Sequence, residues 1–228
     1  MMKKQWFAAL MATAAVVGLS ACSKSASSTT GANDSVIRIA SGSPLSGGQA
    51  AAGKDFANGA QLAVDEINAK GGIEVAGKKY TLELVPEDDQ GDPKTGATVA
   101  QKIVDDKSIV AVIGHYNSGV TMVANSIYAK GNRAALTVST NPDVIRKAPK
   151  LADGATSIFR MDAHDGMQGP ALAVFAQKKG VKKLAILDDA TAYGKGLGDQ
   201  VANKAKELGM DVGLRESATD KTVDFKAI

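Results

Sequence analysis

Short apolar runs alternate with amphipathic helical patterns through most of this 228-residue chain. A β-rich run at residues 36–40 is followed by Phe56, Ala60, Val64 and Ile67, which recur at the spacing of one helical face. Apolar strands separated by amphipathic helices are typical of parallel sheets that helices cover on both faces. The sequence therefore predicts an α/β fold with doubly wound parallel sheets.

The same alternation continues to the last residue. We expect strands at residues 36–40, 80–85, 109–113, 134–138, 184–187 and 211–214, with 109–113 and 184–187 buried, and a crossing segment at residues 157–160. We expect helices around residues 56–67, 97–104, 120–127, 167–175 and 197–208, and the start of another at 223–228. Glycines 71 and 72 predict the end of the first helix, because glycine accepts a left-handed cap. Asp92 followed by Pro93 predicts the start of the second helix.

Residues 1–22 have the order of an exported lipoprotein's leader. Lys3 and Lys4 precede an apolar run at residues 6–18, which is short for a membrane-spanning helix. Residues 19–22 (LSAC) resemble the bacterial lipobox, so Cys22 is the expected lipidation site; the alternative is an ordinary signal peptide with a stray cysteine. Residues 23–34 are mostly small and polar, and we expect a flexible linker. An acyl chain would anchor the protein to a membrane at the cell envelope without spanning it.

The composition argues against several classes of function. The formal net charge is +3, and loss of the leader with its two lysines leaves it near neutral. Basic residues form no tract or stripe, so no nucleic-acid partner is expected. A single cysteine excludes an intrachain disulfide, and the two histidines lack metal-ligand spacing, so neither a metal nor a cofactor is expected.

Five segments resemble the leucine/isoleucine/valine-binding family of type I periplasmic binding proteins. They are residues 65–73 (DEINAKGGI), 88–94 (DDQGDPK), 112–118 (VIGHYNS), 139–142 (STNP) and 188–196 (DDATAYGKG). Each motif alone is weak, but five in order at the family's spacing make a specific signal. The resemblance runs from about residue 36 to the last residue.

The resemblance implies a two-lobed fold, with a first lobe at residues 35–156 and an incomplete second lobe at residues 157–228. We expect the chain to be cut short, because the family's later strand crossings and its acidic partner for a ligand ammonium come after residue 228. In the family's pattern Ser118 and Thr140 hold a ligand carboxylate, and a carbonyl near Val138 or Ser139 accepts from the ammonium. Tyr193 closes over the ligand from the second lobe.

Two departures from the family pattern concern the pocket. Some members carry a disulfide between the positions of Gly91 and Asn117, and both cysteines are absent here. A ring-bearing wall residue of some members falls near Ala52, which implies a roomier or differently lined pocket. Branched-chain specificity is therefore one of several possibilities that the residues allow.

Each candidate residue also has a plainer interpretation. Ser118 has the position of a helix N-cap, Thr140 that of an ordinary turn contact, and Tyr193 that of an exposed loop tyrosine. Asp188 and Asp189 lie at a strand's carboxyl end, where they would either face a ligand or cap the next helix. His115 is assigned no role.

The expected function is that of a substrate-binding lipoprotein of an ABC importer. It would bind a branched-chain or similar amino acid between its lobes and deliver it to permease and ATPase subunits. Nucleotide-enzyme motifs fail, because no G-x-G-x-x-G is present and Gly53-Lys54 is followed by Asp55 rather than Ser or Thr. A ligand-sensing receptor domain of the same fold, or binding of an amide, urea or aromatic acid, remains open.

Overall fold

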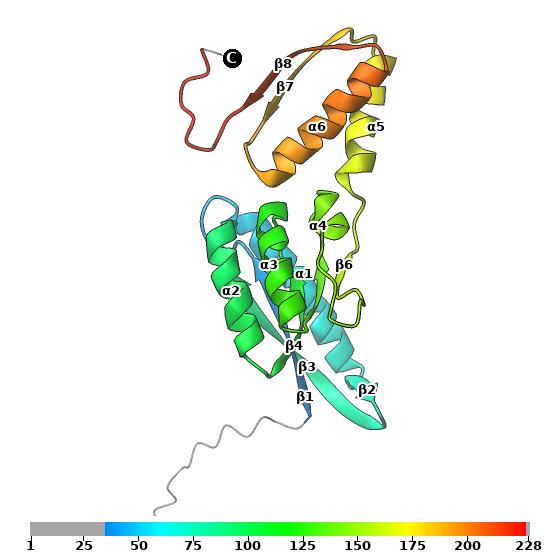
Figure 1. The fold of residues 1–228 in the computed structure, drawn as a ribbon. Coiled ribbons are helices and arrows are strands. Elements are labelled where there is room, and N and C mark those ends of the chain that lie inside the picture. Colours follow the sequence, from blue (N-terminus) through cyan, green and yellow to red (C-terminus); the bar gives the residue numbers. More distant parts are fainter. Residues whose placement is uncertain (1–34, 227–228) are drawn as a thin grey trace, which may run out of the picture. The chain divides into compact units, whose positions relative to one another are not determined.

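The computed structural model describes residues 35–226, in which eight strands and six helices alternate (Figure 1). Six strands form one sheet in the order β2-β3-β1-β4-β5-β6, which is parallel except for the antiparallel β2–β3 pair. Its strands are β1 (Val36–Ser43), β2 (Ile73–Val75), β3 (Lys78–Asp88), β4 (Ile109–Gly114), β5 (Ala134–Thr137) and β6 (Ile158–Arg160).

Helices cover this sheet on both faces, as the sequence predicts. They are α1 (Ala50–Ala69), α2 (Pro93–Asp105), α3 (Ser118–Lys130) and the short α4 (Asp143–Arg146). The crossover from β1 to β3 runs in one direction along the sheet, whereas those from β3 to β4 and from β4 to β5 run in the other. Because parallel crossovers are right-handed, α1 lies on one face while α2 and α3 pack together on the opposite face (Figure 1).

The main core lies under α2 and α3. Ile103, Val112 and Ile158 are almost fully buried there, together with the ring of Tyr128. Each large aliphatic side chain removed from water in such a core contributes roughly 1.5–3 kcal/mol. Burial of these side chains therefore holds α2 and α3 against this face of the sheet.

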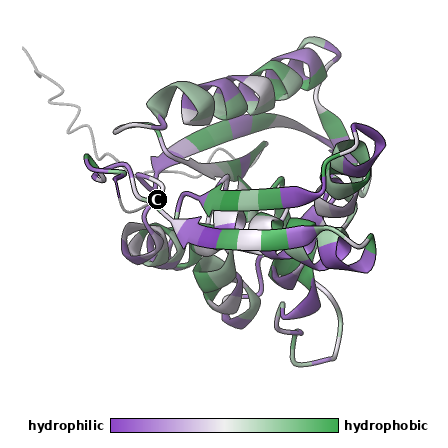
Figure 2. Ribbon diagram, turned by 90° about the horizontal axis from the view of Figure 1, so that it is seen from above, coloured by the Kyte–Doolittle hydropathy of each residue, from purple (hydrophilic) through white to green (hydrophobic). Residues whose placement is uncertain are grey.

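A second, smaller sheet follows. Strands β7 (Lys183–Asp188) and β8 (Asp211–Ser217) pair in parallel, and Figure 2 shows hydrophobic residues along most of β7 but a mixture of hydrophobic and hydrophilic residues along β8. Helices α5 (Asp165–Lys178) and α6 (Ala192–Glu207) pack together beside them. Ala173, Ala205 and Met210 form the buried centre of this part.

The structure corrects three of the sequence predictions. The strand at 109–113 is not buried throughout, because Val110 is 53% exposed. The strand at 184–187 is not buried throughout either, because Leu184 packs on the small core while Leu187, on the other face, is 50% exposed. No helix begins at residues 223–226, the described part of the predicted 223–228 segment. Strand β2 and helix α4 were not predicted, since each is too short to show a period.

Both predicted helix boundaries are confirmed. The Asp92 carboxylate accepts a hydrogen bond from the Thr95 N–H at 2.8 Å and caps α2. Gly71 and Gly72 follow the end of α1 with φ of 93° and 80°. Within residues 35–226, no helix is both long enough and apolar enough to cross a membrane. The predictions for residues 1–34 lie outside the described residues.

Gly72 provides a test of this fold. A Cβ on Gly72 would lie 1.9 Å from the Tyr80 carbonyl oxygen, and its positive φ disfavours any side chain. We expect Gly72→Ala to lower the free energy of unfolding by about 2 kcal/mol or more in urea titrations. Gly59→Ala is the matched control, because a Cβ there meets nothing within 4 Å inside α1. It should raise stability by roughly 0.5–1 kcal/mol; equal effects would contradict the assigned turn.

Candidate ligand-binding site

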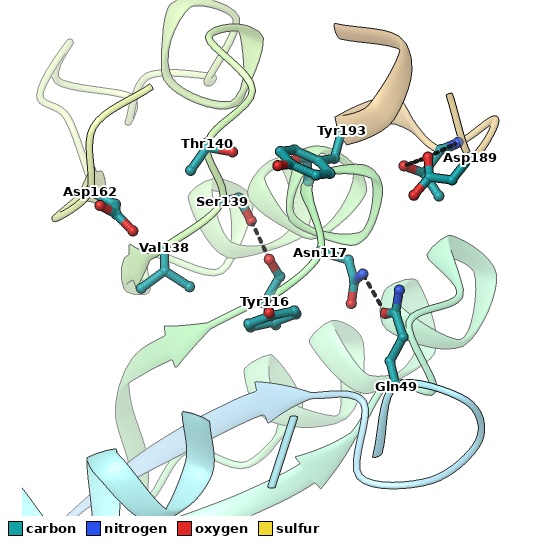
Figure 3. A pocket seen from close by; sticks show the side chains of 11 residues that line it. Gln49, Tyr116, Asn117, Val138, Ser139, Thr140, Asp162, Asp189 and Tyr193 are labelled. Atoms are coloured by element: carbon teal, nitrogen blue, oxygen red, sulfur yellow. Dashed lines mark hydrogen bonds between the residues drawn. The ribbon is translucent and has the colours of Figure 1, made fainter. Parts of the chain in front are cut away.

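Loops from several strands surround a pocket of about 340 Å³ at the carboxyl ends of the strands (Figure 3). Open parallel sheets place their ligands at this edge. All five predicted binding residues line the pocket. Its lining consists of Gln49, Tyr116, Asn117, Ser118, Val138, Ser139, Thr140, Asp162, Asp189, Thr191 and Tyr193.

Ser118 is the first residue of α3 and is 3% exposed. Asn117, not Ser118, occupies the N-cap position, and it makes no side-chain cap to the helix. The Ser118 hydroxyl oxygen accepts from the Asn141 N–H at 3.4 Å. The first-turn amides of α3 thus lack a side-chain cap and carry the positive end of the helix dipole, an arrangement that favours an anion.

Residues 138–140 form the facing wall. The Ser139 hydroxyl lies 3.0 Å from the His115 carbonyl oxygen and 3.1 Å from the Tyr116 carbonyl oxygen, so it joins the two walls. The Ser139 N–H donates to the Thr137 hydroxyl at 2.9 Å. Ser139 is therefore occupied by internal contacts, whereas Thr140 and Val138 present their side chains at the pocket (Figure 3).

An amide pair closes one end of the pocket. The Asn117 side-chain N–H donates to the Gln49 side-chain oxygen at 2.7 Å, which ties the loop after β4 to the loop before α1 (Figure 3). A Cβ on Gly91 would lie within 3.1 Å of Gln49 and 3.4 Å of Asn117. Gly91 and Asn117 are thus neighbours, and hydrogen bonding joins the loops where the resemblance implies a disulfide in some relatives.

The loop before α6 forms the remaining wall. The Thr191 hydroxyl caps α6 by accepting from the Gly194 N–H at 3.0 Å, and the Asp189 carboxylate accepts from the Thr191 hydroxyl at 2.6 Å. Tyr193 stands in the first turn of α6 and is 37% exposed. The Asn141 side chain donates to the Ala192 carbonyl oxygen at 2.8 Å, so it joins this loop to the wall at residues 138–140.

A family model described as a periplasmic binding protein matches residues 36–228. The chain belongs to the periplasmic binding protein family. A Leu/Ile/Val-binding protein homolog of Brucella abortus is 38% identical over 194 residues, which cover 84% of this chain and 49% of that protein. An amino acid binding protein of Pseudomonas aeruginosa is 34% identical over 86% of this chain and 50% of its own length. This binding protein therefore spans about half the length of the curated relatives it matches.

Solved structures agree with this assignment. The branched-chain amino acid transporter substrate-binding protein of Streptococcus pneumoniae, in complex with isoleucine, is 29% identical with a TM-score of 0.71. The match covers 84% of this chain and 52% of that one. A benzoate complex of a Rhodopseudomonas palustris solute-binding protein, at 21% identity and a TM-score of 0.70, shares the fold. The expected type I fold is confirmed, and the family is one of binding proteins.

Several pocket residues of this binding protein were not predicted. Gln49, Tyr116, Asn117, Asp162 and Thr191 all follow strands or precede helices at the ligand edge of the sheet. Their position after a strand is the signal that would have found them. Side-chain direction, which decides whether such a residue faces the pocket, is not available from the pattern alone.

The sequence left two roles open for Asp188 and Asp189, facing a ligand or capping the next helix. Asp189 lines the pocket and supports the α6 cap, whereas Asp188 pairs with Arg215 of β8 and accepts from the Ala190 N–H at 2.8 Å. Burial acts to raise the pKa of Asp188, but hydrogen bonds to its carboxylate outweigh burial, and the pKa lies below its usual value. Asp188 therefore stabilises the β7–β8 unit in its ionised form.

The pH dependence of stability tests this role. A carboxyl group whose pKa is lowered by folding stabilises the protein above its unfolded pKa of about 4, and this stabilisation is lost as the pH falls further. We expect Asp188→Asn to be less stable than the wild type at pH 7 in urea titrations, with the difference shrinking below about pH 4. The exposed Asp220→Asn is the control. A difference independent of pH would contradict the ionic role.

Proposed function

We propose that this binding protein captures a branched-chain or similar amino acid in the pocket and delivers it to an ABC importer. The observation that carries the proposal is the start of α3, where Ser118 and uncapped first-turn amides share one pocket with Thr140. Amides at a helix N-terminus suit a carboxylate. The relatives named as Leu/Ile/Val-binding proteins support the choice of ligand.

The other groups of the pocket fit an amino acid held by its carboxylate. Carbonyl groups at Val138 and Ser139 would accept from its ammonium group, and the Asp162 and Asp189 carboxylates lie in the same lining. Tyr193, from the start of α6, would cover the ligand. The ligand's ammonium group would lie beside carboxylates and its carboxylate at a helix N-terminus. These two contacts would orient a zwitterionic amino acid in the pocket.

Ser118→Ala tests the carboxylate site. We expect it to weaken leucine binding by about 1–3 kcal/mol, because a hydrogen bond to a charged group contributes about that much. Isothermal titration calorimetry would measure the change. Ser126→Ala is the matched control, because Ser126 lies exposed on the same helix. Equal affinities for wild type and Ser118→Ala would place the carboxylate elsewhere.

Aromatic acids, amides and urea are the alternative solutes. Ala52 lines a neighbouring open groove with Phe56 and Tyr116, and the Phe56 and Tyr116 ring centroids are 6.0 Å apart. The two rings thus stand beside the pocket. The residue on α1 near the position of the ring-bearing wall residue of some family members is the small Ala52. A thermal-shift screen with amino acids, benzoates, amides and urea would separate these ligands. Stabilisation by none of them would contradict solute binding.

We also propose that the protein is a periplasmic lipoprotein anchored through Cys22 and a linker at residues 23–34. The proposal rests on the lipobox-like residues 19–22 and on the family, whose description is periplasmic. An acyl anchor would hold it near the permease and ATPase subunits of an importer.

Cys22→Ser tests the anchor. Without the thiol there is no acylation, so we expect the variant to move from the membrane pellet to the soluble fraction of fractionated cells. Wild-type protein should pellet and be released by detergent. Continued detergent-sensitive pelleting of Cys22→Ser would contradict the lipobox.

A further inference from the structure

His115 is a fully buried titratable residue that neither lines the pocket nor is used by the proposed function. Its ring Nδ1 lies 2.7 Å from the Asp89 carboxylate, and its Nε2 lies 2.7 Å from the Tyr128 hydroxyl. The side chains of Asp89 and Tyr128 are themselves almost fully buried. Three polar groups thus form a continuous chain inside the sheet's main core.

Both ring nitrogens of His115 have a buried partner. A carboxylate only accepts, so Nδ1 donates to Asp89. Burial, together with nearby carboxylates, raises the pKa of the Tyr128 phenol, so its hydroxyl stays available as the partner of Nε2. Every polar atom of the ring is used by a buried partner, as burial requires.

The main chain of His115 is held as firmly as its ring. Its carbonyl oxygen lies 2.8 Å from the Thr137 hydroxyl and 3.0 Å from the hydroxyls of Thr121 and Ser139. These hydroxyls come from α3, from β5 and from the wall at residues 138–140. The carbonyl therefore sets the spacing between the loop that leads to Ser118 and the wall that carries Thr140.

Asp89 extends the network to a third loop. Its carboxylate also accepts from the Gly91 N–H at 2.8 Å, and its own N–H donates to the Ser43 carbonyl oxygen. The loop after β3 is thus tied to β1 and, through the ring of His115, to the loop after β4. The loops after β3, β4 and β5 all border the pocket or the amide pair of Asn117 and Gln49.

We propose that His115 is a positioning residue of the ligand pocket, joining the loops after β3, β4 and β5 so that the start of α3 faces Thr140 before ligand arrives. This inference rests on the proposed function, because the group that it positions is the carboxylate site at Ser118. A site ordered in advance binds more tightly, because less conformational freedom is lost on binding. His115 acts through Ser118 and the α3 amides and does not touch the ligand.

Paired substitutions separate the two sides of the ring. His115→Asn keeps a donor near the position of Nδ1 and so retains the bond to Asp89, whereas His115→Gln reaches the position of Nε2 and leaves Asp89 without its ring donor. We expect His115→Gln to weaken leucine binding at least about tenfold, and His115→Asn less, because loss of the donor to Asp89 unties the loop after β3 from the loop that leads to Ser118. His164→Gln, at the other histidine, should bind as the wild type does.

Affinities are compared by NMR titration at a temperature where circular dichroism shows every variant folded. Rescue of binding in His115→Asn relative to His115→Gln, at matched thermal stability, is the signature of positioning rather than of general stability. Wild-type affinity in a folded His115→Gln variant would overturn the proposal.

Nitrogen-15 spectra of the wild-type chain provide a test that needs no substitution at His115. The sequence has two histidines, so His164→Gln assigns both rings. We expect the His115 ring-nitrogen signals to shift when leucine is added, because the ring joins the loops that carry the ligand site. His115 signals that leucine leaves unmoved while backbone signals at Ser118 shift would overturn the positioning role. Absence of any leucine-induced shift would instead overturn the proposed function.

Discussion

Parallel pairing of β1 with β3 and β4 is the constraint on which the rest of the structure depends. Parallel strands end at a common edge, so the loops that follow them are brought together whatever their separation in sequence. Gln49, Asn117 and Thr140 meet for this reason, although up to 91 residues separate them along the chain. The right-handed crossovers then place α3 so that its N-terminus, rather than its side, faces this edge.

The edge is held in shape by polar contacts inside the protein. Thr121, Thr137 and Ser139 direct their hydroxyls at one buried carbonyl, and Asp89 and Tyr128 take both nitrogens of one ring. Such groups are costly to bury unpaired, since each lost partner costs roughly 1–3 kcal/mol. Their mutual pairing therefore specifies one loop arrangement. The apolar core beneath supplies stability but, being non-directional, leaves the loops less well defined.

The alternation of strands and helices could be predicted because each element buries a face, and burial leaves a period in the sequence. The starts and ends at Asp92 and Gly72 were readable because capping and positive φ demand particular residues. Ser118 and Thr140 came from motif resemblance, and the structure places both in one pocket. The contacts of His115 were not predictable, because its partners lie 26 and 13 residues away and no local pattern links them. The burial assigned to Leu187 was wrong, because an apolar run does not reveal how many of its faces are covered.

Hydrogen bonding between Asn117 and Gln49, beside Gly91, has a consequence for biogenesis. The chain's one cysteine lies at position 22, so residues 35–226 contain no thiol. Maturation of this part needs no oxidant and no isomerase to sort cross-links, and the loops near the pocket hold the same geometry whatever the redox potential around them.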